Sequence, residues 1–261
     1  MTTLDAGEWT RRATALLSAV LVVDVTLVIT NLAGGPAFLD LDAENNFPTW
    51  YSSAKLMSTA LAALGLARLP AGRGSTRRRR LRWSLVAVLF AALSIDETAA
   101  WHERLATAVF SSDAAAGLRG RLLGGDPGKD ALLWPVLFAP VVLGLLYFLA
   151  AVLWTELRRD RLSRILGLAG CLLLLSAVGL ESLAALGSPP IEVWGTAEVA
   201  RYRLLVLLEE SSEVAAATAL LAALLRHLAR ARNLGREPSR RLAAESLASR
   251  EEATKPRSLG A

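Results

Sequence analysis

Histidine and cysteine are scarce in this sequence, and their scarcity excludes several kinds of site. The only histidines are His102 and His227, and the arginine pattern places them at opposite membrane surfaces, so no haem with two histidine ligands is expected. Two histidines are also too few for membrane desaturase-like or ceramidase-like sites. The single cysteine, Cys171, rules out an intramolecular disulfide and leaves the redox compartment undetermined.

Several motifs of membrane enzymes are incomplete or missing. The stretch "LEESSE" (208–213) has the paired glutamates of membrane CAAX-type proteases, but no arginine follows at the right place and the second histidine is absent. Di-iron bundles use Glu-x-x-His, whereas this chain has only Glu210-x-x-Glu213. No nucleophile-elbow pattern supports a Ser-His-Asp hydrolase. No internal repeat is visible, which disfavours a standard secondary-transporter fold.

Apolar residues, by contrast, are abundant, at 53% of the 261 residues. They form runs of about 20 residues, the length that a helix needs to cross a bilayer, and such runs must be helical because lipid offers the backbone no hydrogen-bond partners. We therefore predict an all-α polytopic membrane protein, with six transmembrane helices in one bundle. The predicted spans are about 13–33, 49–69, 83–105, 131–153, 165–186 and 202–226.

The predicted membrane domain covers residues 13–228, between a short N-terminal segment, 1–12, and a basic tail, 229–261. The first span is long for a signal peptide and contains Asp24, so we expect it to be retained. Pro48 after Asn46 is a good start for the second span. The tail mixes charge, Ser and Pro without apolar periodicity, which predicts a flexible segment.

Basic residues cluster on one side of the predicted topology. They precede the first span, follow the second, fourth and sixth, and include the block "RRRRLR" (77–82). By the positive-inside rule both termini are then cytoplasmic, and the protein is expected in the inner (plasma) membrane. Because every basic block borders a span, we expect contact with the lipid bilayer and not with nucleic acid. Only three of the 29 basic residues are lysine, which suggests a bacterial, GC-rich origin.

Carboxylates gather in the predicted outer half of the membrane. Three spans that are distant in sequence contribute them, and His102 lies near the same surface. The candidate site comprises Glu97, His102, Glu103, Glu181, Glu209, Glu210 and Glu213, with Asp96, Lys55, Asp40, Asp42 and Glu44 as accessory residues. His102 points about 100° or more away from the acids of its own span if the helix is regular, so convergence of the whole set requires a helix end or kink there.

Ionised carboxylates in a low-dielectric layer are costly, so something must neutralise them. Protonation, pairing with Lys55 or Arg104, and ligation of a metal cation are the routes that the sequence leaves open. Carboxylates with one imidazole suit a divalent metal (Zn, Mn, Fe, Mg or Ca), which could support hydrolytic or redox chemistry on a lipid-like substrate. The alternative is a transporter or channel that uses the same carboxylates for protons or cations. The oligomeric state is left open.

Three motifs also resemble a group of bacterial multi-pass membrane proteins that have no assigned activity. They are "PTWYSS" (48–53), "SIDETAAWHE" (94–103) and "EESSE" (209–213). The resemblance covers these motifs and the six-span layout. It implies that the acids and the histidine belong to one site, and it supplies no reaction.

Overall fold

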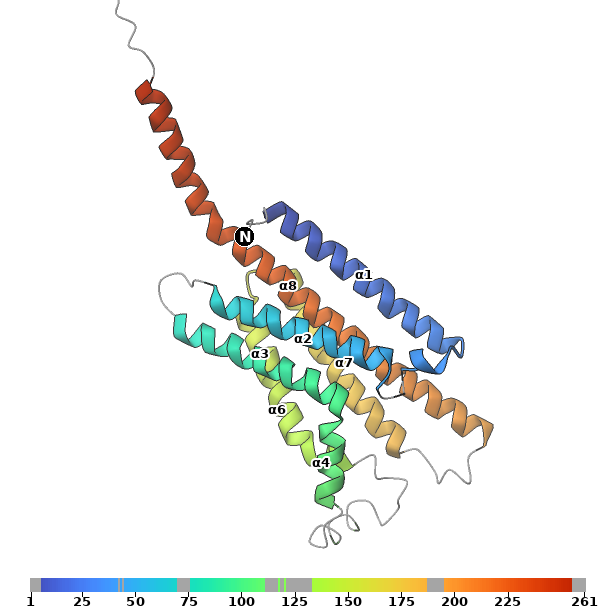
Figure 1. Cartoon of the computed structure of the whole chain (residues 1–261). Coiled ribbons are helices and arrows are strands. Elements are labelled where there is room, and N and C mark those ends of the chain that lie inside the picture. The colour runs from blue at the N-terminus through green and yellow to red at the C-terminus, as the bar shows by residue number, and fades with distance from the viewer. Residues whose placement is uncertain are drawn as a thin grey trace, which may run out of the picture.

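The computed structural model describes residues 6–41, 43, 45–69, 76–110, 117, 120, 133–186 and 195–254, and this part of the chain is all-helical (Figure 1). The all-α prediction is confirmed for these residues. The helices are α1 (Ala6–Leu32), α2 (Phe47–Arg68), α3 (Thr76–Ala99), α4 (Trp101–Phe110), α6 (Leu133–Glu156), α7 (Arg161–Leu186) and α8 (Thr196–Thr254), with a 3-10 turn η1 (Ala37–Leu39) after α1.

Side-chain caps define the start of α2 and the end of α1. The side chain of Asn46 accepts a hydrogen bond from the backbone N–H of Thr49 at 3.2 Å, and Pro48 lies in the first turn, as the sequence predicted. Asn31, near the end of α1, donates to the carbonyl of Leu39 at 2.8 Å and accepts from the N–H of Leu41 at 2.9 Å. These bonds hold the α1–α2 connection against the bundle.

Helix α8 is the central element of the bundle. It packs against α1, α2 and α7, while α3 pairs with α2, and α6 contacts α7 and α4. In Figure 1, α1 and α7 run beside α8 over most of its bundled part. The α7–α8 contact is close, because a Cβ atom on Gly170 would lie 2.6 Å from Cγ of Leu220. The largest core cluster includes Leu66, Phe90 and Leu153.

Within the described chain, three helical segments are long and apolar enough to cross a membrane, rather than the six that were predicted. They are Arg11–Leu32, Leu137–Glu156 and Arg161–Ala184, in α1, α6 and α7. The apolar segments of α2, α3 and α8 contain Lys55, Glu97 and Glu213 respectively. These ionisable residues lower the mean hydropathy of the helices that carry them. The number of spans and the orientation of the termini stay predictions.

The outer surface of the bundle carries many large apolar side chains. Large apolar side chains on α1, α6 and α7 are exposed, among them Val22, Tyr147 (78%) and Leu172. The lysine inside α2, Lys55, faces the interior, and its side chain is only 3% exposed. An apolar exterior around polar interior groups is the arrangement expected of a helical membrane protein.

Several predicted boundaries differ from the structure, and α1, α3 and α8 begin at Ala6, Thr76 and Thr196, before the spans expected from 13, 83 and 202. The span expected at 83–105 ends at Ala99, and a separate helix, α4, begins at Trp101. The tail expected to be flexible is helical as far as Thr254, because α8 continues beyond the bundle (Figure 1). Abundant Ala, Leu, Arg and Glu in this stretch favour a helix even though it lacks an apolar face.

Candidate functional site

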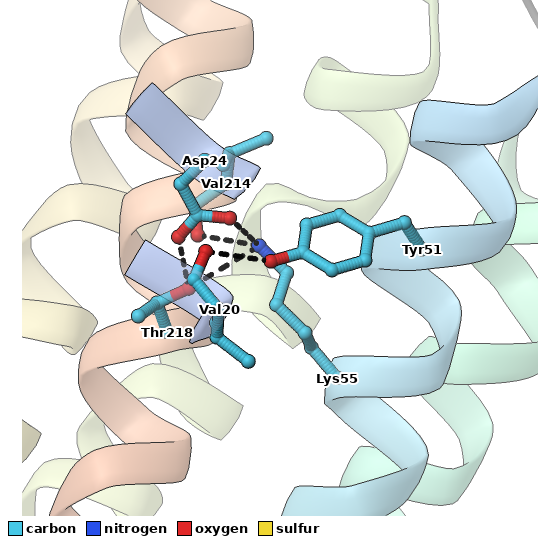
Figure 2. A network of polar contacts seen from close by, with 6 residues as sticks. All are labelled: Val20, Asp24, Tyr51, Lys55, Val214 and Thr218. Atoms are coloured by element: carbon cyan, nitrogen blue, oxygen red, sulfur yellow. Dashed lines mark hydrogen bonds and ion pairs between the residues drawn. The ribbon is translucent and has the colours of Figure 1, made fainter. Parts of the chain in front are cut away.

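A buried lysine joins three helices near the centre of the bundle (Figure 2). Nζ of Lys55, on α2, donates to Oδ1 of Asp24 at 3.0 Å, to the carbonyl of Val214 at 2.9 Å and to Oγ1 of Thr218 at 3.3 Å. Asp24 comes from α1, and Val214 and Thr218 come from α8. An ammonium group has three protons, so each one has an acceptor.

The remaining polar atoms around this lysine are also satisfied. The hydroxyl of Thr218 donates to the second carboxylate oxygen of Asp24. The ring of Tyr51 lies 4.5 Å from Nζ of Lys55, a cation–π distance, and its hydroxyl donates to the carbonyl of Val20 at 2.9 Å. We call Asp24, Tyr51, Lys55, Val214 and Thr218 the Lys55 network. Asp24, which the sequence analysis set apart from the acidic site, is the ion-pair partner of Lys55.

A second ion pair forms where α3 ends and α4 begins. Ala100 has a positive φ of 45°, which turns the chain between the two helices. Asp96 then accepts a hydrogen bond from the backbone N–H of His102 at 3.1 Å, and its other oxygen lies 2.7 Å from Nδ1 of that histidine. The sequence required a helix break to bring His102 to the acids, and the structure confirms one between α3 and α4. Asp96 is bonded directly to His102.

Two glutamates from different helices lie beside this pair. Glu97 on α3 is within electrostatic range of Glu213 on α8, of Lys55, and of both members of the Asp96–His102 pair. Glu213 is likewise within range of Asp96 and His102. We call Asp96, Glu97, His102 and Glu213 the carboxylate cluster. The structure thus brings together four of the residues predicted from the sequence, from three helices.

Two serines align α2 with α3 next to the carboxylate cluster. Oγ of Ser53 lies 2.7 Å from the carbonyl of Ser94, and Oγ of Ser94 lies 2.9 Å from the carbonyl of Ser53. Ser94 is two residues before Asp96 and Ser53 is two residues before Lys55. The reciprocal bonds fix the register of the helices that carry both ion pairs.

The other predicted site residues take different places. Glu181 on α7 and Glu209 and Glu210 on α8 are half-buried, and each has a polar or electrostatic partner. Asp40 follows η1 and is exposed. Asp42, Glu44 and the side chain of Glu103 lie outside the described part of the chain. Among the described residues, no three His, Cys, Asp or Glu side chains are grouped so as to hold a metal ion.

An open pocket of about 630 Å³ borders the carboxylate cluster, between α4 and α6. Asp96 and His102 form part of its wall. Its lining residues are Asp96, Trp101, His102, Arg104, Leu105, Ala108 and Phe138. The pocket therefore connects the Asp96–His102 pair with an apolar surface.

A third group of charges lies about 20 Å from Asp96 along α3, near Trp83. Asp160, between α6 and α7, accepts from the N–H of Ser163 at 3.3 Å and from Nε of Arg226 at 3.3 Å. The ring of His227 stacks on Trp83, with 6.2 Å between centroids. We call Trp83, Asp160, Ser163, Arg226 and His227 the Asp160 cluster.

The charges around Asp160 affect its protonation. Burial raises the pKa of this carboxyl, but the hydrogen bond from Ser163 and the charge of Arg226 outweigh burial and leave the pKa below its usual value. Sequence reasoning missed this cluster, since it treated the arginines only as topology signals. It also missed the pairing of Asp24 with Lys55, although one acid and one base inside two neighbouring apolar spans are a recognisable signal.

The chain belongs to the family described as Domain of unknown function (DUF8692), which matches residues 13–228. No curated protein and no solved structure matches the chain. The matched range contains the Lys55 network, the carboxylate cluster and the Asp160 cluster.

Proposed function

We propose that this protein is an integral membrane protein that binds and releases protons at Glu97 and Glu213, as part of proton- or cation-linked transport. The observation that supports the proposal is the pairing of the surrounding charges. Lys55 is bonded to Asp24, and Asp96 is bonded to His102. The two described cations that act on the charge of Glu97, Lys55 and His102, are each bonded to another carboxylate, and Glu213 acts on the same glutamate with a like charge.

Two neighbouring carboxylates inside a membrane protein rarely carry two negative charges at once. Mutual repulsion and low dielectric favour a state in which the pair holds one proton or one cation. Such a pair can take up a proton when it is open to one side and lose it when it is open to the other. Lys55 lies within range of Glu97 as well as of Asp24, so a change in the charge of Glu97 also affects the Lys55 network.

The proposal includes the topology expected from the sequence. In it, α2, α3 and α8 cross the bilayer beside the three apolar segments, and both termini lie in the cytoplasm. The exposed apolar surfaces of α1, α6 and α7 support this arrangement, because they would meet lipid. The carboxylate cluster then lies in the outer half of the plasma membrane, where protons can enter from outside.

One observation favours a second function, the binding of a divalent metal. Histidines that ligate metals usually hold their other ring nitrogen against a carboxylate, and Nδ1 of His102 lies 2.7 Å from Asp96. With Glu97 and Glu213 within electrostatic range, the same cluster could then supply imidazole and carboxylate ligands. A metal there would serve hydrolytic or redox chemistry on a lipid-like substrate at the membrane surface.

Proton flux in proteoliposomes tests the first function. The purified chain is reconstituted with a pH-sensitive dye inside, and a pH step is imposed in the presence of potassium and valinomycin. We expect flux to fall at least tenfold in Glu97→Gln and in Glu213→Gln, because an amide cannot exchange a proton. Glu198→Gln is the matched control, since Glu198 is an exposed glutamate in the first turn of the same α8 helix.

Elemental analysis of the same preparations tests the second function. One metal per chain, lost in Glu213→Gln and retained in Glu198→Gln, would establish metal binding at the cluster. In the proteoliposome experiment, a proton flux through the wild-type protein equal to that of empty vesicles would rule out the proton function. The absence of bound metal from preparations supplied with Zn, Mn and Fe during purification would rule out the metal function.

A further inference from the structure

We propose that the pocket between α4 and α6 binds an anionic amphiphile, a molecule with an acyl chain and a carboxylate or phosphate headgroup. This inference goes beyond the proposed proton binding, because the pocket can hold such a ligand whether or not Glu97 and Glu213 exchange protons. Its volume of about 630 Å³ is within the range of small-molecule sites.

The surface that lines the pocket is almost entirely apolar, and its polar part is small. Asp96, His102 and Arg104 form the polar part. Four side chains from α4 and α6 form the apolar part: Trp101, Leu105, Ala108 and Phe138. A ligand that satisfies both parts needs one charged end and one hydrocarbon end.

The charges of the polar part favour an anionic headgroup. Asp96 is bonded twice to His102, through the backbone N–H at 3.1 Å and Nδ1 at 2.7 Å, so its negative charge is already engaged. Arg104 is exposed in the first turn of α4 and adds a guanidinium to the wall. Guanidinium groups bind carboxylates and phosphates through two parallel hydrogen bonds.

The apolar wall lies where membrane amphiphiles can reach it. Trp101 is 66% exposed and Leu105 is 52% exposed, although both are large and apolar. Exposed apolar surface at a pocket is typical of a binding site. The polar residues of α4, His102 and Arg104, border the same pocket, so the helix can lie at the membrane surface with the headgroup toward water. The occupant that fits is therefore a lipid-derived amphiphile of the surrounding membrane.

Quenching of tryptophan fluorescence by brominated amphiphiles tests the proposal in detergent micelles of the full chain. Bromine quenches a tryptophan only at contact, and Trp101 is the tryptophan in the pocket wall. The probes are 9,10-dibromostearic acid, its methyl ester, and a phosphatidylglycerol with a dibrominated chain. The signal assigned to the pocket is the saturable quenching that is present in the wild-type chain and disappears in Trp101→Phe. The other tryptophans are the same in the wild type and the variant, so their quenching cancels in this comparison.

Three variants separate the headgroup from the chain. We expect Arg104→Gln to raise the half-saturating concentration of the acid about tenfold, the loss of one charge-assisted contact, and to leave the ester unchanged. Arg203→Gln is the matched control, because Arg203 is an exposed arginine on α8 that does not line the pocket. Ala108→Phe fills the apolar part and should abolish saturable quenching by every probe.

The three probes also identify the source of the ligand. Saturation by the acid alone supports a free fatty acid, saturation by phosphatidylglycerol alone supports a phospholipid, and saturation by both supports the shared anionic chemistry. Equal binding of ester and acid, with no effect of Arg104→Gln, would overturn the proposal. So would saturable quenching that persists unchanged in Trp101→Phe or Ala108→Phe.

Discussion

The Lys55 network and the Asp160 cluster both pair a buried carboxylate with a cation beside α8, but they satisfy their polar atoms differently. In the Lys55 network the ammonium is 3% exposed and has three acceptors. In the Asp160 cluster the carboxylate is 1% exposed, while its partner Arg226 is 47% exposed. The first pair is closed within the protein, and the second reaches the surface.

Unpaired polar atoms show the same contrast. In the part of the chain that the structure describes, four buried side-chain atoms have no hydrogen-bond partner, and all four belong to the Asp160 cluster. They are Nε1 of Trp83, Oδ2 of Asp160, Oγ of Ser163 and Nδ1 of His227. No atom of the Lys55 network is among them. In the Lys55 network, by contrast, a charge between apolar segments finds all its partners in neighbouring helices.

The largest effect is expected when the closed pair loses one member. Lys55→Met leaves the Asp24 carboxylate buried without its cation, which should lower the free energy of unfolding by about 3–5 kcal/mol. The midpoint of thermal unfolding in detergent should then fall by roughly 10 °C. The double variant Asp24→Asn/Lys55→Met is the control and should recover most of the loss, because no charge stays unpaired. A double variant as unstable as the single one would contradict this account.

A smaller effect is expected when the network keeps its charges and loses one hydroxyl. Thr218→Val removes the donor to Asp24 and one acceptor of Lys55, so stability should fall by about 1–3 kcal/mol. Thr155→Val is the matched control, because the hydroxyl of Thr155 bonds only to carbonyls of its own helix, at 2.9 and 3.1 Å. Thermal unfolding compares the two, and equal midpoints would contradict the role of Thr218.

The smallest effect is expected in the Asp160 cluster. Asp160→Asn keeps the acceptor for the N–H of Ser163 and loses the attraction to half-exposed arginines, so it should cost about 0.5–1 kcal/mol. Because the folded-state pKa of Asp160 is lowered, its contribution is present above about pH 4 and is lost as the pH falls through the folded pKa. Wild type and variant should therefore differ at pH 7 and converge in acid. A difference that grows in acid would contradict the assignment.

Much of the local structure could be predicted from the sequence. The helical state of the apolar runs follows from the lack of backbone partners in lipid, and the start of α2 follows from Asn46 and Pro48. The helix end near Ala100 was required by geometry, since Asp96 and His102 are six residues apart and cannot share a face of a regular helix. These inferences use only neighbours in the chain.

The partners of the buried charges could not be predicted in this way. The sequence offered Lys55 as one possible partner of the outer acids, and the structure bonds it to Asp24, 31 residues away, and to Thr218, 163 residues away. Such contacts depend on how each helix is rotated about its axis, which the apolar pattern of a membrane helix leaves nearly undetermined because lipid and core are both apolar.

The sequence by itself determined that the apolar segments are helical, where α2 begins, and which residues carry the charges. Only the tertiary structure decided that Asp24 pairs with Lys55, that Asp96 pairs with His102, and that Glu97 and Glu213 come within electrostatic range. The physical reason is that a helix forms from bonds between residues four apart, whereas a buried charge is stabilised by whichever groups the packing of distant helices brings within hydrogen-bond distance.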